Sequence, residues 1–180
     1  MTRVLVAHAS KYGSVEEVAR YVGAVLRDRG EACDVVAARQ AHDLEGYDLV
    51  VLGTGLYMGR LHREARRFLR HHRDELAGLP FAVFAMGPLS DDPAEKDKVR
   101  PQLERGLKRY PELEPVATEI IGGDIDPERM PFPYNRMPAG DHRDQQVAGV
   151  GDARVGQHAL DVGLEQRRDV PHRHGQDGDP

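Results

Sequence analysis

Short β-rich runs alternate with stretches of helical periodicity along residues 3–121 of this chain. In the helical stretches, apolar residues recur every three or four positions between charged ones, as on an amphipathic helix. One β-rich run, residues 47–52, is apolar nearly throughout, which is typical of a strand covered on both faces. The pattern predicts strands at 3–9, 33–36, 47–52, 79–86 and 115–121, and helices from residue 15 and over 61–76 and 93–110. This alternation favours a parallel sheet with helices on both faces.

The first predicted helix carries signals at both ends. Ser14 is an expected N-cap, and Glu16 and Glu17 stand in the first turn, where the helix dipole favours negative charge. Gly30 is expected to end the helix. Pro93 is expected in the first turn of the last helix.

The chain changes character near Gly122. Aromatic residues stop at Tyr134, and residues 139–180 are rich in Gly, Asp, Arg, Gln and His, with sparse apolar residues out of period. We therefore expect one folded domain over residues 1–138 and a largely disordered or aberrant tail over 139–180.

Composition narrows the class of protein. A length of 180 residues fits one domain, and a formal net charge of -5 argues against a nucleic-acid partner. Cys33 is the single cysteine, so no intramolecular disulfide can form. No apolar run approaches the length of a membrane span, and the first strand follows Met1 without a signal peptide. We expect a cytoplasmic protein, with loose attachment to a membrane surface left open.

Three loops are expected at the carboxyl edge of the sheet, where open α/β sheets bind ligands. The first, residues 10–15, joins a central strand to a helix. It offers backbone N–H groups and the hydroxyls of Ser10 and Ser14 to a phosphate. A helix cap with a turn glycine explains the same residues equally well.

The second loop, residues 53–60, contains three glycines that allow close approach to a flat ligand, beside Tyr57 and Met58 as stacking groups. It matches neither the dinucleotide fingerprint nor a Walker A loop. The alternative is a turn whose Tyr57 merely packs on the sheet. The third loop begins at Gly87 and Pro88 and can close the other side of the same ligand, although Gly-Pro is also an ordinary turn.

Other chemistry-bearing residues have simpler interpretations. His71 and His72 lack the spacing of a metal site and are expected to be solvated. Cys33, without a partner motif, is expected to be structural. A run of arginines follows the second loop, and we expect a solvated helix face there, with a site for anionic substrates or lipid headgroups as the alternative. These arginines are Arg60, Arg63, Arg66, Arg67 and Arg70.

The segments VLVAHASKYGSVEEVA, VVLGTGLYMGRL and FAMGPL, in that order, resemble the flavodoxin-domain proteins related to menaquinone-dependent protoporphyrinogen dehydrogenase. The resemblance continues through GGDIDPERMPFP and PAGDHRD, from about residue 2 to about residue 144. It implies a three-layer α/β/α sandwich with strand order 2-1-3-4-5. It also implies FMN as cofactor, with its phosphate on the first loop and its ring between the second and third. The implied FMN-binding residues are Ser10, Lys11, Tyr12, Gly13, Ser14, Val15, Thr54, Gly55, Leu56, Tyr57, Met58, Gly59, Gly87, Pro88 and Leu89.

Two departures from the family pattern stand out. Val15 occupies a position where the family has threonine, so one hydroxyl donor to the phosphate is missing. After PAGDHRD the family continues with a tryptophan-bearing amphipathic helix, whereas this chain has no tryptophan and no periodicity there. Our hypothesis is that the tail comes from a shifted reading frame or a truncated gene. Without that helix, a patch of the sheet would be exposed and prone to self-association, so a homodimer is one candidate assembly.

The resemblance implies an FMN-dependent oxidoreductase, with a porphyrinogen or a quinone as candidate substrate. No side chain is an obvious acid or base, and the catalytic residues stay unassigned. Two alternatives remain open: a non-enzymatic electron carrier that docks a redox partner, and a degenerate domain without cofactor.

Overall fold

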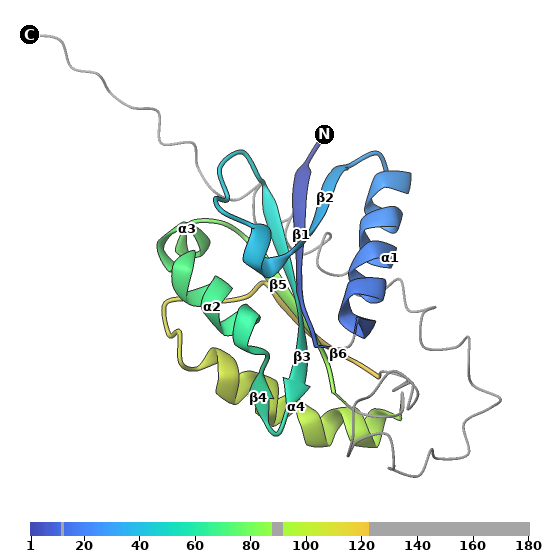
Figure 1. Cartoon of the computed structure of the whole chain (residues 1–180), viewed down its shortest axis with the longest axis vertical. Coiled ribbons are helices and arrows are strands. Elements are labelled where there is room, and N and C mark those ends of the chain that lie inside the picture. The colour runs from blue at the N-terminus through green and yellow to red at the C-terminus, as the bar shows by residue number, and fades with distance from the viewer. Residues whose placement is uncertain (12, 88–91, 123–180) are drawn as a thin grey trace, which may run out of the picture.

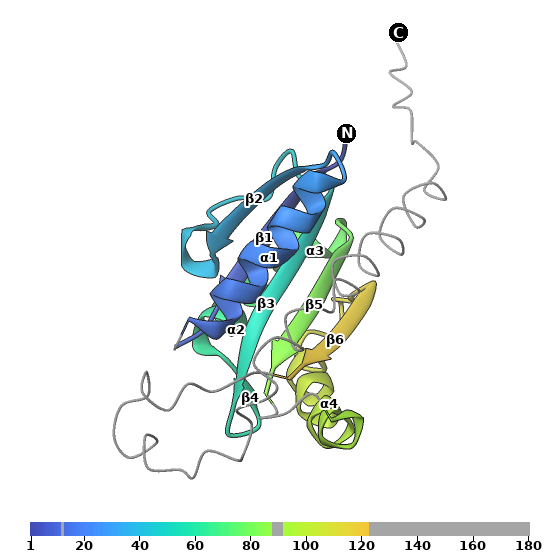
Figure 2. The same ribbon diagram turned by 90° about the vertical axis from the view of Figure 1, so that its right-hand side faces the viewer.

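A parallel sheet runs through the middle of the molecule, with helices on both of its faces (Figures 1 and 2). The structure is a computed structural model, and it describes residues 1–11, 13–87 and 92–122. The strands are β1 (Arg3–Ala9), β2 (Ala32–Ala37), β3 (Leu49–Tyr57), β4 (Arg60–Leu61), β5 (Phe81–Met86) and β6 (Ala117–Ile121). The order β2-β1-β3-β5-β6 confirms the predicted topology, and the additional β4 pairs antiparallel with the end of β3.

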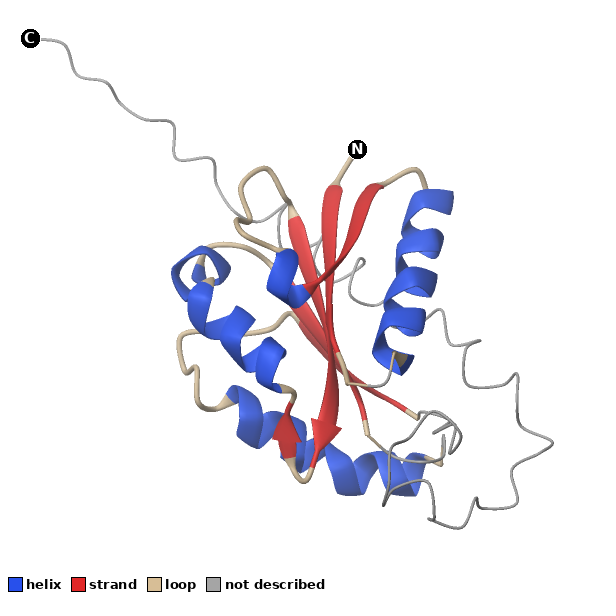
Figure 3. Cartoon of the chain, in the orientation of Figure 1, coloured by secondary structure: helices blue, strands red, loops and turns tan. Residues whose placement is uncertain are grey.

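The helices divide between the two faces of the sheet. They are α1 (Ser14–Asp28), α2 (Arg63–His71), α3 (Arg73–Ala77) and α4 (Pro93–Leu107), with a short 3-10 turn η1 (Ala38–Gln40) after β2. In the described part of the chain, α1 covers one face, and α2, α3 and α4 lie on the other side (Figure 3).

The alternating side chains of β1 build both cores. Val4 and Val6 pack with the apolar face of α1, whereas Leu5 and Ala7 pack with α2 and α4 on the other face. All four side chains are almost completely buried. Because successive residues of a strand point to opposite faces, an apolar run in a central strand supplies two cores at once.

The third strand is longer than predicted. It continues through Tyr57, so most of the expected second loop is strand. The reason lies in the neighbouring strand: a Cβ on Gly53 would stand 2.3 Å from the Phe84 ring, so glycine is what lets the two strands pair there. Glycine normally weakens strands, and this hid the extension in the sequence.

The predicted helix over 61–76 is also corrected. β4 takes its first residue, and the rest is split into α2 and α3 at His72. His72 is only 1% exposed, so the expectation that it is solvated is wrong. Its ring nitrogens lie 2.6 Å from a carboxylate oxygen of Glu75 and 3.1 Å from the carbonyl oxygen of Ala41. These contacts satisfy a buried polar ring where the two helices meet.

The predicted ends of α1 are half right. Gly13, not Ser14, is the N-cap, and no side chain caps the helix. Gly30 does follow the other end, with a φ of 85°. There Gly30 N–H donates to the carbonyl of Arg27 and Glu31 N–H to that of Leu26, which is the pattern of a Schellman cap.

Some predictions fall outside the described residues: the structure of the 139–180 tail and the contributions of Tyr12, Pro88 and Leu89. Among the residues that are described, no helix is long and apolar enough to cross a membrane.

Candidate functional site

The loop between β1 and α1 turns sharply at the carboxyl edge of the sheet. Gly13 adopts a φ of 90°, a left-handed conformation that strains any residue with a side chain. Its backbone N–H donates to the hydroxyl oxygen of Ser10 at 3.2 Å. The turn therefore aims the chain directly into α1.

The beginning of α1 presents N–H groups to this loop. The carbonyl of Gly13 accepts from Glu17 N–H at 3.1 Å, which is the first turn of the helix. The N–H groups ahead of that bond, including those of Ser14 and Val15, have no partner within the helix. With the positive end of a 15-residue helix dipole behind them, these groups suit an anion.

Val15 faces the core from this first turn. Its side chain is 1% exposed and packs with Val4, Val6 and Ala19 against the sheet. Val15 can therefore offer an anion its backbone N–H, while its side chain anchors the start of α1 to β1.

Tyr57 connects the end of β3 to this loop. Its hydroxyl oxygen accepts a hydrogen bond from Lys11 N–H at 3.1 Å, across 46 positions of sequence. The ring lies over Gly55, where a Cβ would stand 2.5 Å from it. Tyr57 belongs to the second predicted loop, and its hydrogen bond to Lys11 connects that loop to the first.

Met58 and Gly59 form the two-residue turn between β3 and β4. Their φ angles are 48° and 75°, and the strand residues on either side, Tyr57 and Arg60, are paired. Positive φ at both positions is the conformation of a type I′ hairpin turn. The Met58 side chain is 96% exposed at the tip, so the hairpin projects from the carboxyl edge of the sheet.

The remaining predicted residues have different surroundings. Thr54 is fully buried, and its hydroxyl donates to the carbonyl of Gly55 and accepts from His62 N–H. Its side chain therefore shapes the hairpin from within. Gly87 lies against Leu56, so the start of the third loop contacts the middle of the second.

His62 is a site residue that the sequence analysis missed. Its ring nitrogen accepts from Glu64 N–H at 3.3 Å and caps α2, and the ring meets Tyr57 edge-on at 5.6 Å between centroids. Burial lowers the pKa of His62 from its ordinary value, so its neutral form can act as the cap at neutral pH. A histidine directly before a helix rich in arginine offered no pattern that distinguishes a cap from a solvated side chain.

His8 stands at the other side of the loop, near the end of β1. Burial lowers its pKa, and the nearby Glu16 carboxylate opposes that shift in part. The neutral ring is therefore favoured at physiological pH, so His8 adds no positive charge beside the loop.

The other reactive candidates are structural. Burial raises the pKa of the Cys33 thiol to about 11, which leaves little thiolate at neutral pH. In the part of the chain that the structure describes, no group of three or more His, Cys, Asp and Glu side chains could hold a metal ion.

Known proteins share this architecture and parts of this sequence. The chain is 22% identical over 125 residues to protoporphyrinogen IX dehydrogenase [quinone] of Escherichia coli strain K12, covering 68% of this chain and 69% of that protein. It is 31% identical over 101 residues to the NAD(P)H dehydrogenase (quinone) of Afipia carboxidovorans, covering 44% of this chain and 49% of that protein. A solved flavodoxin from Pseudomonas aeruginosa, a cysteine-to-serine mutant, superimposes with a TM-score of 0.57 at 19% identity, covering 89% of this chain and 99% of that one.

The family model described as a flavodoxin domain matches residues 5–137, which include most of β1, the turn at Gly13, the β3–β4 hairpin, β5 and β6. This chain belongs to the flavodoxin domain family.

Proposed function

We propose that this protein binds FMN at the carboxyl edge of its sheet and acts as an FMN-dependent oxidoreductase. The observation that carries the proposal is the left-handed turn at Gly13, which opens α1 without a side-chain cap directly after a loop that carries the hydroxyls of Ser10 and Ser14. Backbone N–H groups and hydroxyls at a helix N-terminus are suitable donors for the FMN phosphate.

The proposed ring site lies between the β3–β4 hairpin and the segment that begins at Gly87. Three observations support it: Tyr57 bonds to the first loop, Leu56 touches Gly87, and Met58 is exposed at the hairpin tip. We assign Tyr57 and Met58 as the side chains nearest the ring. Lys11, Gly55 and Gly59 contribute backbone, and Thr54 keeps the hairpin in shape.

When bound, FMN would supply the capacity to take up and release electrons or hydride. The chain's own residues would fix the phosphate, orient the ring and exclude water from one of its faces. Neither His8 nor His62 is charged at neutral pH, because burial lowers the pKa of both.

For the substrate we propose a quinone or a porphyrinogen. The support comes from relatives: one is named for protoporphyrinogen IX and quinone, and another for quinone alone. A non-enzymatic electron carrier is the second candidate, favoured by the exposed Met58 at the hairpin tip, which could contact a docking protein.

A visible absorption spectrum of the purified protein, before and after added FMN, tests the cofactor. We expect the spectrum of oxidised flavin and a saturable change on titration. A protein that stays colourless and leaves the spectrum of added FMN unperturbed would contradict the proposal.

Steady-state assays of the FMN-loaded protein then test the reaction class. We expect multiple turnovers with a quinone or with protoporphyrinogen. Electron exchange limited to one equivalent per flavin with every small acceptor would instead identify a carrier.

A further inference from the structure

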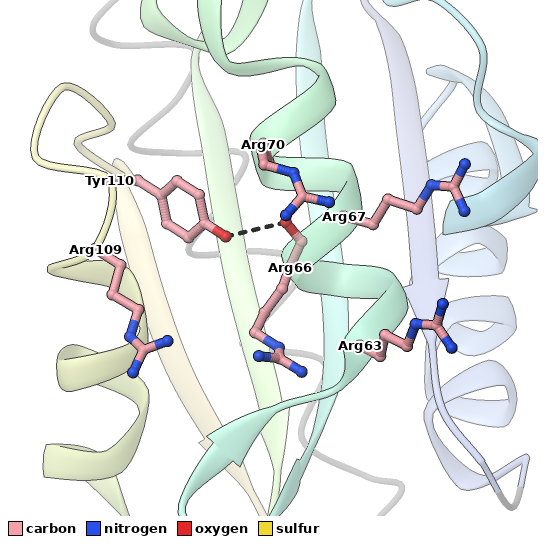
Figure 4. A pocket seen from close by; sticks show the side chains of 6 residues that line it. All are labelled: Arg63, Arg66, Arg67, Arg70, Arg109 and Tyr110. Carbon is pink, nitrogen blue, oxygen red and sulfur yellow. Dashed lines mark hydrogen bonds between the residues drawn. The ribbon is translucent and has the colours of Figure 1, made fainter.

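The arginines of α2 form a pocket together with the segment that follows α4. Its lining residues, which we call the arginine pocket, are Arg63, Arg66, Arg67, Arg70, Arg109 and Tyr110 (Figure 4). The pocket has a volume of about 480 Å³. The expectation of a merely solvated helix face is therefore incomplete, because side chains from two distant segments line this open pocket.

The pocket concentrates positive charge in a protein whose formal net charge is -5. Five of its six lining residues are arginines and none is acidic. Among the described residues, no salt bridge involves any of these five. On α2 the arginines are three and four positions apart, a spacing at which like charges repel. The sequence thus maintains an unfavourable arrangement for the isolated helix.

Arg66 is the inner residue of the pocket. Its Nε atom is buried and has no hydrogen-bond partner among the described residues, which is uncommon for a buried donor. Tyr110 donates its hydroxyl hydrogen to the carbonyl oxygen of Arg66 at 3.0 Å and so holds the two walls together. The guanidinium groups of Arg66 and Arg109 enter the space below the Tyr110 ring from opposite sides (Figure 4).

A second hollow, of about 300 Å³, extends from the pocket to the β3–β4 hairpin. Arg66 and Arg109 line both spaces, and Met58, Gly59 and Arg60 line the far end of the second. A ligand larger than a small ion can therefore occupy the pocket and reach the hairpin.

We propose that the arginine pocket binds a phosphate group, carried either by a soluble phosphate compound or by the headgroup of an anionic lipid. A planar carboxylate is matched by the fork of one guanidinium, whereas a phosphate has oxygens in several directions. Arg66 and Arg109 approach from two elements, and Arg70 lies beside the Tyr110 hydroxyl (Figure 4), an arrangement that suits the second geometry. This proposal does not depend on flavin binding at the α1 loop.

The test compares the wild-type chain with the double variant Arg66→Gln/Arg109→Gln. Two probes are used: inorganic phosphate, by calorimetric titration, and vesicles of phosphatidylcholine with 30% phosphatidylglycerol, by co-sedimentation, a composition chosen for roughly physiological anionic charge. Saturating FMN is present so that the α1 loop does not compete for phosphate. If FMN does not bind, a loss of phosphate binding in the pocket variant still assigns that binding to the arginine pocket, because the α1 loop is the same in both proteins. The matched control, Arg29→Gln/Lys98→Gln, removes the same charge from exposed positions elsewhere.

We expect the pocket variant to bind at least one probe about tenfold more weakly than wild type, with at most a twofold change in the control. Phosphate binding without vesicle binding identifies a soluble ligand, and the reverse identifies a lipid headgroup. Arg66→Lys/Arg109→Lys should recover part of the affinity, because charge is kept and the fork is lost. A melting temperature at or above that of wild type shows that the variant is folded.

Three results would overturn the proposal. The wild-type chain could bind neither probe, the pocket variant could bind both as tightly as wild type, or the control could lose as much affinity as the pocket variant. The last would mean that only overall charge matters.

Discussion

Two places on this molecule are suited to anions, and they are built in opposite ways. At the start of α1 the donors are backbone N–H groups and small hydroxyls, positioned by the turn at Gly13. In the arginine pocket the donors are long cationic side chains from α2 and from the segment after α4. The first is made by one continuous loop, and the second requires two segments more than 35 positions apart, for example Arg66 and Arg109.

The difference between backbone and side-chain donors determines how anion binding at each place should depend on ionic strength. Backbone donors carry no net charge and are already fixed by the fold, so they favour one geometry. Exposed guanidinium groups are flexible and screened by salt, so binding to the pocket should weaken as ionic strength rises. The α1 loop is thus suited to a resident group, and the pocket to one that exchanges.

The largest effect is expected from Gly13→Ala. A φ of 90° strains alanine, and no atom crowds the added Cβ, so the cost is conformational and amounts to about 1–2 kcal/mol. We expect FMN affinity to fall at least tenfold, with phosphate binding in the arginine pocket unchanged. Flavin absorbance titrations measure the first and calorimetry the second.

Gly30→Ala is the matched control, since Gly30 has a φ of 85° and equally open space at the other end of α1. It should destabilise the fold by a similar amount and leave FMN affinity unchanged. Equal losses of FMN affinity in the two variants would contradict the assignment of the α1 loop.

Val15→Thr should strengthen FMN binding at the α1 loop, because it adds a hydroxyl beside the loop's N–H groups. A hydrogen bond to a charged group contributes about 1.5 kcal/mol or more, so we expect FMN to bind up to about tenfold more tightly. The side chain is 1% exposed, and burying a hydroxyl should cost the FMN-free protein about 1 kcal/mol. Fluorescence titration and denaturant melts measure the two effects. Unchanged FMN affinity would indicate that the hydroxyl stays directed into the core.

Arg67→Glu should stabilise the fold, and it should weaken phosphate binding in the arginine pocket. The change replaces two repulsive pairs on α2, with Arg63 and Arg70, by attractive ones, a gain of about 0.5–1 kcal/mol at low salt. Urea denaturation at low and high salt measures the free energy of unfolding, and the gain should shrink as salt rises. Arg29→Glu, at the exposed C-cap of α1, is the control. A loss of stability would show that Arg67 makes a favourable contact within the fold.

The smallest effect is the acid sensitivity that His8 contributes beside the α1 loop. Burial lowers the pKa of His8, so the folded protein binds this proton less readily than the unfolded chain. The stabilising contribution of neutral His8 is therefore complete above the unfolded value of about 6.5 and is lost as pH falls through the lower folded pKa. In His8→Gln, melting temperatures between pH 7.5 and 5 should fall less than in wild type. Parallel curves would refute the expectation, and the arginines, which stay charged throughout, should contribute nothing.

The sequence predicted most of what is local. The central place of β1 and the end of α1 at Gly30 follow from hydrophobic pattern and glycine placement, whereas the strand order was implied by the family resemblance. The strand that continues past Gly53 and the buried ring of His72 were missed. Both depend on a partner elsewhere in the chain, the Phe84 ring in one case and the Ala41 carbonyl in the other.

The candidate site divides in the same way. A small-residue loop between a central strand and a helix marks an anion site by itself, because its donors belong to consecutive residues. That Tyr57 bonds back to Lys11, and that Val15 points into the core, are visible only in three dimensions.

By itself, the sequence determined a parallel α/β sheet with a glycine turn at its carboxyl edge, since hydrophobic period and backbone freedom are properties of neighbouring residues. Only the tertiary structure decided that Arg66 and Arg70 of α2 lie opposite Arg109 and Tyr110 across an open pocket (Figure 4). A run of charges has the same pattern on a solvated helix as on the wall of a pocket. What separates the two is the segment packed opposite, and folding alone brings that segment there.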